Sequence, residues 1–553
     1  MDTDTGMDTG HPVAIRRPEI LRGNGLQHRS GLGRLLGVSC PVAGVALMLG
    51  GLGGVSLSAS AQDASAVGGT DSSTGARAGV SLVPSLSVRE VLTSNVRLST
   101  DNPRADFVSE ITPHLRLNSS SGRLKGYFDY SLRGYLYARE SSANDIQQAL
   151  SAQGTFEAID KWAYIDANAS ISQQTASALG SRSSDNASID SNRSEVSSFR
   201  VSPYVRGRLG GIANYEARWT GASTSSQGSS AGSGSQQASL RLDSDSNSFA
   251  RLGWSADYSQ QTSKFGSRDS RRSDRFGGTL FYSVTPELRL LARAGRESND
   301  LATLNKQQYS TWGFGGVWRP SERTTLDASR DHRFFGNGYN VRFEHRTPRS
   351  VWTYSDSRDV NTSALSGGAD GSRTVFDLLF TQFASIAPDP VQRAALVDSF
   401  LQNNGLTRAT LATGGFLSST ASIQRMKRLS VGLLGVRTTL LLSAYRNDSQ
   451  AVDPTAVGVG DLSNGNGLNQ RAVSLNVSHR LTPLSALSFD FSILKTRSDL
   501  QKRSTELRSL TATWTNRLST DVDLSLSARR ALFDSPNDPY NESALVASLK
   551  VQF

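Results

Sequence analysis

Cysteine is almost absent from this chain of 553 residues, which contains only Cys40. A single cysteine excludes an intramolecular disulfide and a cysteine-rich metal centre. Hydrophobic residues are also scarce, at 37%, while 50 residues are glycine. A chain of this length could hold about three or four soluble domains, but their cores would require amphipathic helices or continuous apolar runs, which are largely missing. The composition therefore disfavours an array of soluble domains.

Motifs for catalysis and metal binding are missing as well. His114, His332, His345 and His479 are scattered through the chain without the spacing of metal ligands, and no Walker-type phosphate loop or zinc motif is present. Residues 228–232 (Gly-Ser-Ser-Ala-Gly) match a nucleophile elbow, but they lie in a Ser/Gly tract without the buried strand and the helix that an elbow needs. We therefore predict no enzymatic activity, no metal and no cofactor.

The chain ends on a strand pattern. Phe553, Val551 and Leu549 alternate with polar residues, which is the period of a half-buried β-strand. A strand that ends in a carboxy-terminal Phe resembles the closing strand of bacterial outer-membrane β-barrels, whose assembly machinery reads that terminus. We therefore expect these three residues to form an assembly signal, with the barrel-assembly machinery and outer-membrane lipid as partners.

The same alternation recurs along the chain, for example at 165–172, 473–478, 487–493 and 522–529. Each run is about ten residues long, which is enough for a tilted strand to cross a hydrocarbon layer. The connections alternate in length. Counting back from the C-terminus, 533–541, 496–505 and 447–470 are long, whereas 518–521, 482–485 and 435–437 are short. The sequence predicts an all-β fold, a large transmembrane antiparallel β-barrel of about 22 strands (roughly 20–22) in the bacterial outer membrane.

Two further features concern loops and strand ends. The Ser/Gly-rich stretches 179–195 and 221–235 have the composition of disordered segments, but they lie between alternating strands, so we interpret them as loops. Aromatic residues occur near the predicted strand ends, where an interfacial girdle would place them: Trp162, Tyr164, Trp312, Trp318, Trp352, Trp514 and Tyr540.

The N-terminal region predicts export. Several arginines precede an apolar stretch at 35–57, and Ala59-Ser60-Ala61 follows as a small-x-small cleavage site. We predict a leader with a signal peptide at 1–61, a short flexible periplasmic segment at 62–78 and the barrel at 79–553. The alternative for 35–57 is a membrane-spanning helix, because the stretch could just cross a bilayer. Its glycines and the Ala-x-Ala sequence favour cleavage, which would also remove Cys40.

One segment, 359–420, lacks the alternation and reads as a helical insert within the barrel. Thr374 and Asp377 have the spacing of a capping box for a first helix. The second helix has four expected cap residues, namely Asp389, Pro390, Gln392 and Gly405. The apolar residues of both helices require burial, so we expect the insert to cap or plug the lumen rather than to extend into solvent.

The motifs of the insert and of a later strand also carry a family resemblance. Residues 386–393 (Ile-Ala-Pro-Asp-Pro-Val-Gln-Arg) and 435–440 (Gly-Val-Arg-Thr-Thr-Leu), together with the signal peptide and the barrel length, resemble the PEP-CTERM system-associated outer-membrane proteins. That family consists of predicted barrels that are found with exopolysaccharide and exosortase loci. The resemblance implies a link to surface polysaccharide export, with polysaccharide-export proteins as partners, and supplies no catalytic residues.

The polar faces of the predicted strands carry an excess of arginine. We predict nine lumen-facing, solute-facing basic residues: Arg133, Arg200, Arg206, Arg208, Arg241, Arg251, Arg289, Arg293 and Arg342. Arginines in a confined lumen attract carboxylate- or phosphate-bearing solutes. The alternative is that they pair with lumen acids and brace the wall. Because the arginines are spread over strands of an exported protein, we predict no nucleic-acid partner.

Two functions follow from these features. The first is passage or export of an extracellular polysaccharide or another anionic solute across the outer membrane. The second is a plugged, non-conducting barrel that docks envelope or polysaccharide machinery through its outer loops. The sequence also leaves open a third function, a membrane-embedded hydrolase with its Ser, His and acidic residue at the barrel rim.

Overall fold

The computed structural model describes residues 79–553 except for twelve short gaps, at 228–231, 246–250, 267–269, 304, 364, 367–375, 377–378, 381–392, 395, 399–414, 454–459 and 501. The predicted leader at 1–61 and the predicted periplasmic segment at 62–78 lie outside these residues. The part of the chain that the structure describes begins at Gly79, where the predicted barrel begins.

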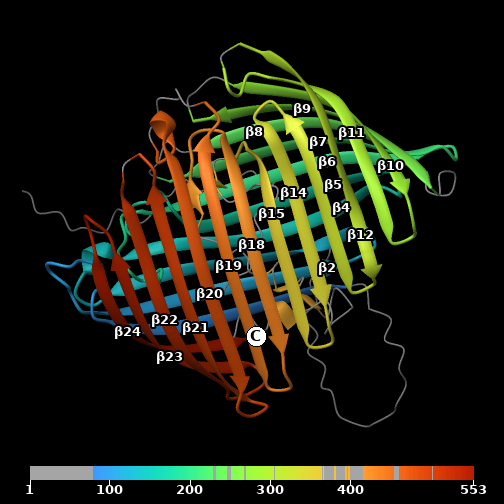
Figure 1. Cartoon of the computed structure of the whole chain (residues 1–553). Coiled ribbons are helices and arrows are strands. Elements are labelled where there is room, and N and C mark those ends of the chain that lie inside the picture. The colour runs from blue at the N-terminus through green and yellow to red at the C-terminus, as the bar shows by residue number, and fades with distance from the viewer. Residues whose placement is uncertain are drawn as a thin grey trace, which may run out of the picture. The chain divides into compact units, whose positions relative to one another are not determined.

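A single antiparallel sheet of 22 strands dominates the structure (Figure 1). Its strands are β1 (Val80–Thr93), β2 (Asp106–Ser120), β3 (Leu124–Tyr137), β4 (Asp145–Ile159), β5 (Ala163–Thr175), β6 (Arg193–Leu209), β7 (Ala213–Ser226), β8 (Ser233–Ser244), β9 (Leu252–Phe265), β10 (Arg271–Ser283), β11 (Leu288–Asn299), β12 (Gln307–Ser321), β13 (Thr324–Arg333), β14 (Gly336–Arg346), β15 (Ser350–Asn361), β18 (Ser422–Leu434), β19 (Thr438–Ala451), β20 (Gly467–Arg480), β21 (Ser485–Ser498), β22 (Ser504–Arg517), β23 (Val522–Asp534) and β24 (Tyr540–Gln552).

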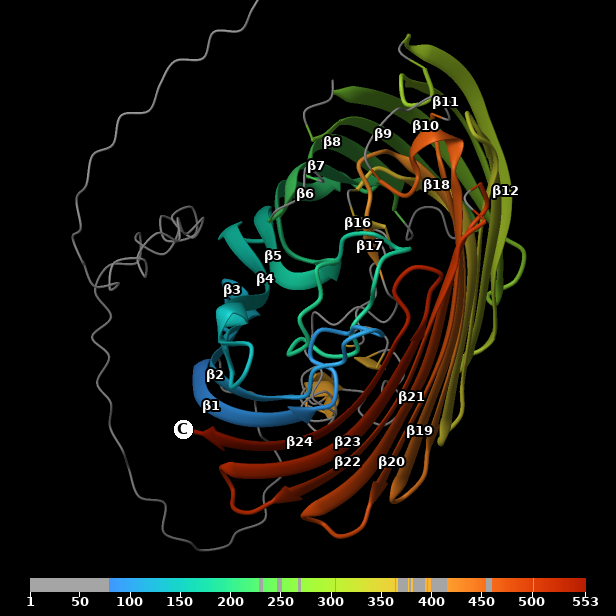
Figure 2. The same cartoon turned by 90° about the vertical axis from the view of Figure 1, so that its left-hand side faces the viewer.

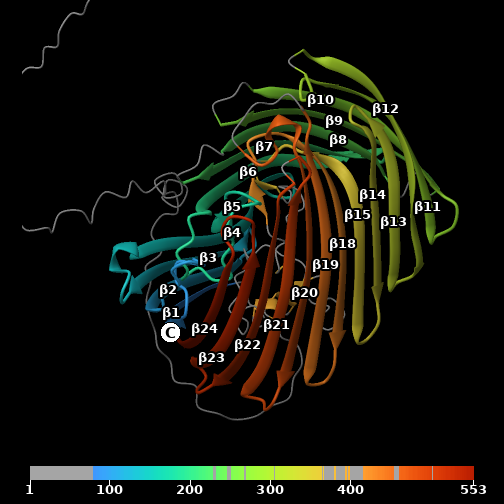
Figure 3. The same cartoon turned by 60° about the vertical axis from the view of Figure 1, so that its left-hand side comes forward.

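The first and last strands close the sheet into a barrel. β24 pairs with β23 on one side and with β1 on the other (Figure 3), in a register that runs from Ser85 opposite Gln552 to Thr93 opposite Ala544. The backbone N–H of Phe553 continues this pairing by donating to the carbonyl of Pro84, at 3.0 Å. The closed barrel and its strand number confirm the predicted fold, and the C-terminal alternation is the closing strand.

The alternation separates an apolar outer face from a polar inner face. On β24 and at the terminus that follows it, Leu545, Leu549 and Phe553 are 60%, 41% and 73% exposed on the outside, whereas Glu542 and Ala544 are buried inside. A closed sheet satisfies the backbone of every strand, which is what a lipid environment demands. The apolar outer face is therefore the lipid-facing surface of the barrel.

The aromatic residues divide between the two faces. Trp162, Trp312, Trp318 and Trp352 are exposed and share the outer face with the lipid-facing residues, as a girdle requires. The prediction is wrong for Tyr164 and Tyr540, which are buried on the inner face. Tyr164 stacks on Tyr204, with 5.2 Å between ring centroids, because the strand period places both rings on the lumen side.

The connections confirm the predicted alternation of short and long. At one end of the barrel lie tight turns such as 160–162, 210–212, 435–437, 481–484 and 518–521, and at the other end lie longer connections such as 94–105, 176–192 and 452–466. The turn at 210–212 uses Gly210 at a φ of +58°, a conformation that suits glycine. The long connections are shorter than predicted, because the strands continue two to five residues beyond the apolar part of each pattern.

This architecture is that of a bacterial outer-membrane β-barrel. An even strand number, short turns at one end, longer loops at the other and an apolar outer band characterise that class, in which the short turns face the periplasm. The protein is therefore located in the bacterial outer membrane. Among the described residues, the structure contains no helix with the length and apolar character needed to span a membrane.

The orientation can be tested with two matched cysteines. Leu500, between β21 and β22, and Leu484, between β20 and β21, are 62% and 58% exposed at opposite ends of the barrel. In intact cells, a membrane-impermeant maleimide is expected to label Leu500→Cys and not Leu484→Cys, while both react in lysed cells. The parent chain controls for Cys40, and labelling of Leu484→Cys alone would reverse the assigned orientation.

Candidate functional site

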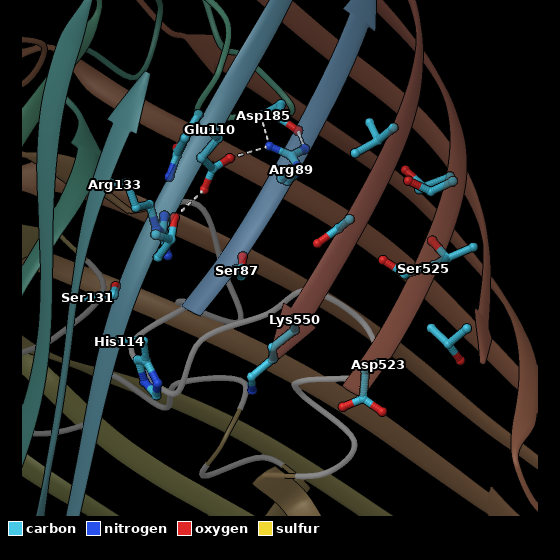
Figure 4. A pocket seen from close by; sticks show the side chains of 18 of the residues that line it. Ser87, Arg89, Glu110, His114, Ser131, Arg133, Asp185, Asp523, Ser525 and Lys550 are labelled. Carbon is cyan, nitrogen blue, oxygen red and sulfur yellow. Dashed lines mark hydrogen bonds and ion pairs between the residues drawn. The ribbon is translucent and has the colours of Figure 1, made fainter. Parts of the chain in front are cut away.

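The lumen contains a cavity of about 930 Å³. Its wall is rich in hydroxyl and amide groups, contributed by strands on both sides of the β1–β24 closure (Figure 4). Examples are Ser87, Thr112, Ser131, Gln147, Thr511 and Ser525. Such groups donate and accept hydrogen bonds, so the cavity is suited to hydrated, polyhydroxylated or weakly charged solutes.

The charges that line this cavity are nearly balanced. Among the described lining residues, seven are basic, Arg89, Arg116, Arg133, Arg480, Arg517, Arg529 and Lys550, and six are acidic, Glu110, Asp129, Asp185, Asp398, Asp490 and Asp523. Many of them form pairs across the wall, as Arg116 does with Asp129 at 2.9 Å. The cavity therefore has an ordered pattern of both signs rather than one strong field.

The connection between β5 and β6, residues 176–192, folds into the lumen from the long-loop end (Figure 2). One part of it packs Ala178 and Leu179 in a buried apolar cluster with Phe416, Leu462 and Leu468. Ser177 adds a hydrogen bond to the Asp461 carboxylate, at 2.8 Å. This inward loop is thereby attached to the connection between β19 and β20 and to the start of β20.

The other part of the inward loop is attached to the wall on either side of the barrel closure. Asp185 forms salt bridges with Arg89 of β1 and Arg529 of β23. Next to it, Ala187 packs in a buried cluster that includes Val91 and Val108 of β1 and β2. Ionic and apolar contacts therefore anchor the loop across the lumen, where it narrows the passage.

The charges around Asp185 form one connected network, and Figure 4 shows Arg89 between Asp185 and Glu110. Arg89 donates to Glu110 at 2.7 Å, and Arg529 donates to Glu542 at 3.0 Å. Burial alone would raise the pKa of Asp185, but the neighbouring guanidinium groups of Arg89 and Arg529 hold that pKa well below its usual value. The two arginines therefore stabilise the carboxylate form of Asp185.

The sequence predicted 179–195 as a loop but not its inward path. The sequence prediction also missed the four strand residues of this network, because each is one polar residue in an alternating strand: Arg89, Glu110, Arg529 and Glu542. The one available signal was the presence of Leu179, Ala187 and Ile189 in an otherwise polar stretch, because apolar residues in a loop call for burial.

The connection between β15 and β18 supplies the second group of lumen residues. It contains the short paired strands β16 (Leu365–Ser366) and β17 (Phe416–Leu417). Our prediction began the helical insert at Asp359, which is wrong by three residues, because β15 continues its pairing with β18 to Asn361. The strand continues because its backbone groups still have partners on β18.

Part of the predicted insert is described. Phe376, Leu379 and Phe380, and later Arg393, Ala394 and 396–398, have helical backbone, whereas the predicted caps Asp389, Pro390, Gln392 and Gly405 lie outside the described residues. The helical insert as a unit therefore stays a prediction.

The contacts of these helical residues lie inside the barrel. Leu379 and Val397 pack in a buried cluster with Leu441 of β19. Asp398 lies 3.7 Å from the Arg116 guanidinium of β2. Leu441 and Arg116 are both near the short-turn ends of their strands, so a connection that starts at the long-loop end reaches the other end of the lumen.

Eight of the nine predicted basic residues lie in the barrel wall on its inner face, as the pairing register shows. Several brace that wall. Arg241 pairs with Asp243 at 2.7 Å and Arg293 with Asp331 at 3.2 Å. Others lie over aromatic rings: Arg206 over Tyr164 at 4.4 Å and Arg289 over Phe281 at 4.0 Å. Arg200 lies opposite Asn168.

The remaining predicted arginines differ in their surroundings. Arg133 lines the cavity, and Arg208 and Arg342 are exposed on the inner face of β6 and β14. In the described part of the structure these three make no salt bridge. Arg251 lies just before β9 at the short-turn end, where its backbone carbonyl accepts a hydrogen bond from the Ser283 N–H of β10 at 2.8 Å, so it lies at the rim of the wall rather than within a strand.

No group of three or more potential metal ligands occurs among the described residues. Most of the elbow-like run 228–232 lies outside them. His114 instead contacts the Asp129 carboxylate at 2.9 Å, which makes it a wall residue of the lumen.

Comparisons with known proteins give a fold likeness only. No family model and no curated protein matches this chain. Among solved structures, the FrpB iron transporter from Neisseria meningitidis (F5-1 variant) is 10% identical, with coverage of 85% of this chain and 82% of that chain and a TM-score of 0.44. The siderophore receptor PirA from Acinetobacter baumannii is 8% identical, with coverage of 85% and 80% and a TM-score of 0.41.

A third similar structure is OccK5 (OpdH) from Pseudomonas aeruginosa, which is 11% identical, with coverage of 85% of this chain and 98% of that chain and a TM-score of 0.29. All three TM-scores are below 0.5, so these likenesses carry no argument about the function of this chain.

Proposed function

We propose that this barrel is a transport protein that passes polar, hydrated solutes across the outer membrane. The observation that carries the proposal is the lumen cavity with its wall of hydroxyl, amide and paired charged groups. A lumen that served only as a solid anchor would be filled by packed side chains, as in small barrels. Here a cavity stays open beside the inward loop.

The solute class follows from the two parts of the wall. Hydroxyl and amide groups favour a polyhydroxylated solute such as a saccharide. The three arginines that have no salt bridge within the described residues favour a solute with carboxylate or phosphate groups. Passage of an extracellular polysaccharide, which the family resemblance implies, belongs to this class and remains a proposal.

The alternative function is the plugged docking barrel. The contacts of the inward loop and of the helical residues support a narrow lumen, which both functions share. Single-channel conductance in a planar bilayer separates them: stable openings support transport, and their absence in a folded barrel supports docking.

Selectivity tests the solute class. Replacing Arg133, Arg208 and Arg342 together by Gln should lower the permeability of anions relative to cations by about two- to fivefold, because three lumen cations are lost. The measurement is the reversal potential in a salt gradient.

A charge-neutral pair of substitutions is the control for that experiment. Arg293→Gln with Asp331→Asn removes both partners of a lumen salt bridge, so the net charge is unchanged and the reversal potential should be too. Equal shifts in both variants would show that the arginines without salt bridges do not set selectivity.

A further inference from the structure

The outer face of the barrel carries a row of cations near the long-loop end of β18 to β21. Lys427 lies opposite Arg446, Arg446 opposite Arg471, and Arg471 opposite Lys495. All four residues share the face of the lipid-exposed residues of their own strands, such as Leu429 on β18, Val473 on β20 and Phe489 on β21. The row therefore faces away from the lumen.

Further basic residues extend this row into a band. Arg425, Arg497, Arg508 and Arg530 lie on the same outer face of β18, β21, β22 and β23. The side chains of Lys427, Arg446 and Lys495 are 39%, 46% and 53% exposed. Solvent or a ligand can therefore reach the charged groups. We call these eight residues the basic band.

The band costs the barrel stability. Like charges directly opposite each other on adjacent strands repel one another, and the row places four cations side by side. Asp356, Asp448 and Glu506 compensate in part, with Lys427, Arg446 and Lys495 as partners at 3.2, 3.0 and 3.0 Å. Asp534 of β23 lies on the same face, opposite Glu506. Four carboxylates against eight cations leave a positive excess, which an anionic ligand would neutralise.

The position of the basic band along the strands indicates which kind of ligand it binds. On β21, the outward residues Leu487, Phe489, Phe491 and Ile493 are followed directly by Lys495 and Arg497 toward the long-loop end. The cations thus begin where the apolar surface ends, which is the level of lipid headgroups. The short turns face the periplasm, so this is the headgroup level of the outer leaflet.

Other cations occur on the outer face near the long-loop end, for example Lys264 of β9, Arg296 of β11 and Arg330 of β13, but on β18 to β21 they lie directly opposite one another in a row of four. At the long-loop ends of β1 to β4 the outward residues are apolar, namely Leu92, Phe107, Leu136 and Ile146. A general need for cations at the membrane boundary would place them around the whole circumference. The direct pairing of cations on β18 to β21, together with the apolar surface on β1 to β4, favours a localised binding surface.

We propose that the basic band binds the phosphate groups of a phosphorylated glycolipid of the outer leaflet. Adjacent strands are about 4.8 Å apart, so the row of four cations extends over roughly 14 Å, which allows contact with more than one phosphate at once. Arginine and lysine at the membrane surface attract anionic headgroups, and guanidinium groups bind phosphate through paired hydrogen bonds.

The test compares binding of three probes to the purified, delipidated full-length barrel by native mass spectrometry: bisphosphorylated lipid A, its dephosphorylated form, and inorganic phosphate as a competitor. The barrel should bind the phosphorylated lipid, bind the dephosphorylated lipid far more weakly, and keep the lipid in the presence of millimolar phosphate. Removing three cations of the row by Arg446→Gln, Arg471→Gln and Lys495→Gln should weaken binding by about a hundredfold.

Two control variants test whether the loss of lipid binding is specific to the basic band. The lumen substitutions Arg133→Gln, Arg208→Gln and Arg342→Gln remove the same charge from the inner face and should leave lipid binding unchanged. Arg471→Gln alone, which should weaken binding by about fivefold, serves if the triple variant fails to assemble. Equal binding of the two lipids, displacement by inorganic phosphate, or an equal loss in the lumen variant would each overturn the proposal.

Discussion

Removing both lumen obstructions should raise single-channel conductance several-fold, far more than removing either one. The inward loop 176–192 lies toward the long-loop end, and the helical residues of the β15–β18 connection contact the wall near the short-turn end. Two narrow regions in series add their resistances, so the second limits the current when the first is opened. A wall of 22 strands is wide enough to leave a large lumen once it is cleared.

Both segments can be excised between residues that are paired across neighbouring strands. Thr175 pairs with Arg193, so a short Gly-containing turn can join β5 to β6 in place of 176–192. Ser366 pairs with Phe416, so a similar turn can replace 367–415. Conductance of the parent, the two single excisions and the double excision is then measured in planar bilayers, together with the sensitivity of cells to large antibiotics.

An outer connection that does not line the cavity provides the control. Shortening 499–503, between β21 and β22, should leave the conductance unchanged. A double excision that conducts no better than one single excision would show that the two elements obstruct the same point. An unchanged conductance in a folded double variant would favour the docking function.

Replacing Asp185 by Asn should destabilise the barrel by about 3–5 kcal/mol, the usual cost of removing one partner from a buried ionic network. Asp185 contacts Arg89 and Arg529, whose side chains are 22% and 7% exposed, so both arginines lose a counter-charge in a poorly solvated place. The inward loop should also become sensitive to protease. Denaturant unfolding in lipid vesicles measures the first effect and limited proteolysis the second.

The matched control is Asp243→Asn, which removes a carboxylate paired with Arg241, a residue whose side chain is 62% exposed. A solvent-exposed pair contributes only about 0–1 kcal/mol, so this variant should unfold almost as the parent does. Similar losses of stability in the two variants would contradict the anchoring role of Asp185.

The pH dependence of the Asp185 effect follows from the direction of its pKa shift. The pKa in the folded barrel lies below the ordinary value of 3.8, so the stabilisation is complete above about pH 4 and declines only as the pH falls toward the folded pKa. The difference in stability between the parent and Asp185→Asn should therefore be constant from neutral pH to about pH 4 and shrink below it. A difference that fell already near pH 6 would mean that Asp185 is not held by the two arginines.

Sequence alone was enough for the barrel wall, because its determinants are local. A period of two is visible within about ten residues of any strand, and lipid selects apolar side chains on the outward positions within the hydrocarbon layer. The alternation therefore repeats from β1 to β24, with a break at the β15–β18 connection. The lengths of the connections then showed which ends of the strands share a side. The faces of Arg133, Arg208 and Arg342 could be read in the same way, since the face of a residue depends only on its position in its own strand.

Only the tertiary structure determined which residues contact one another inside the lumen. Asp185 meets Arg89 and Arg529 across separations of 96 and 344 residues, and such pairs depend on the register of strands far apart around the barrel. Which arginines pair with acids, as Arg293 does with Asp331, depends on the same register. The inward path of 176–192 also arises from closure, since a loop beside an open sheet has no opposite wall to contact. A local pattern determines the face of each residue, whereas the closed barrel determines its partner.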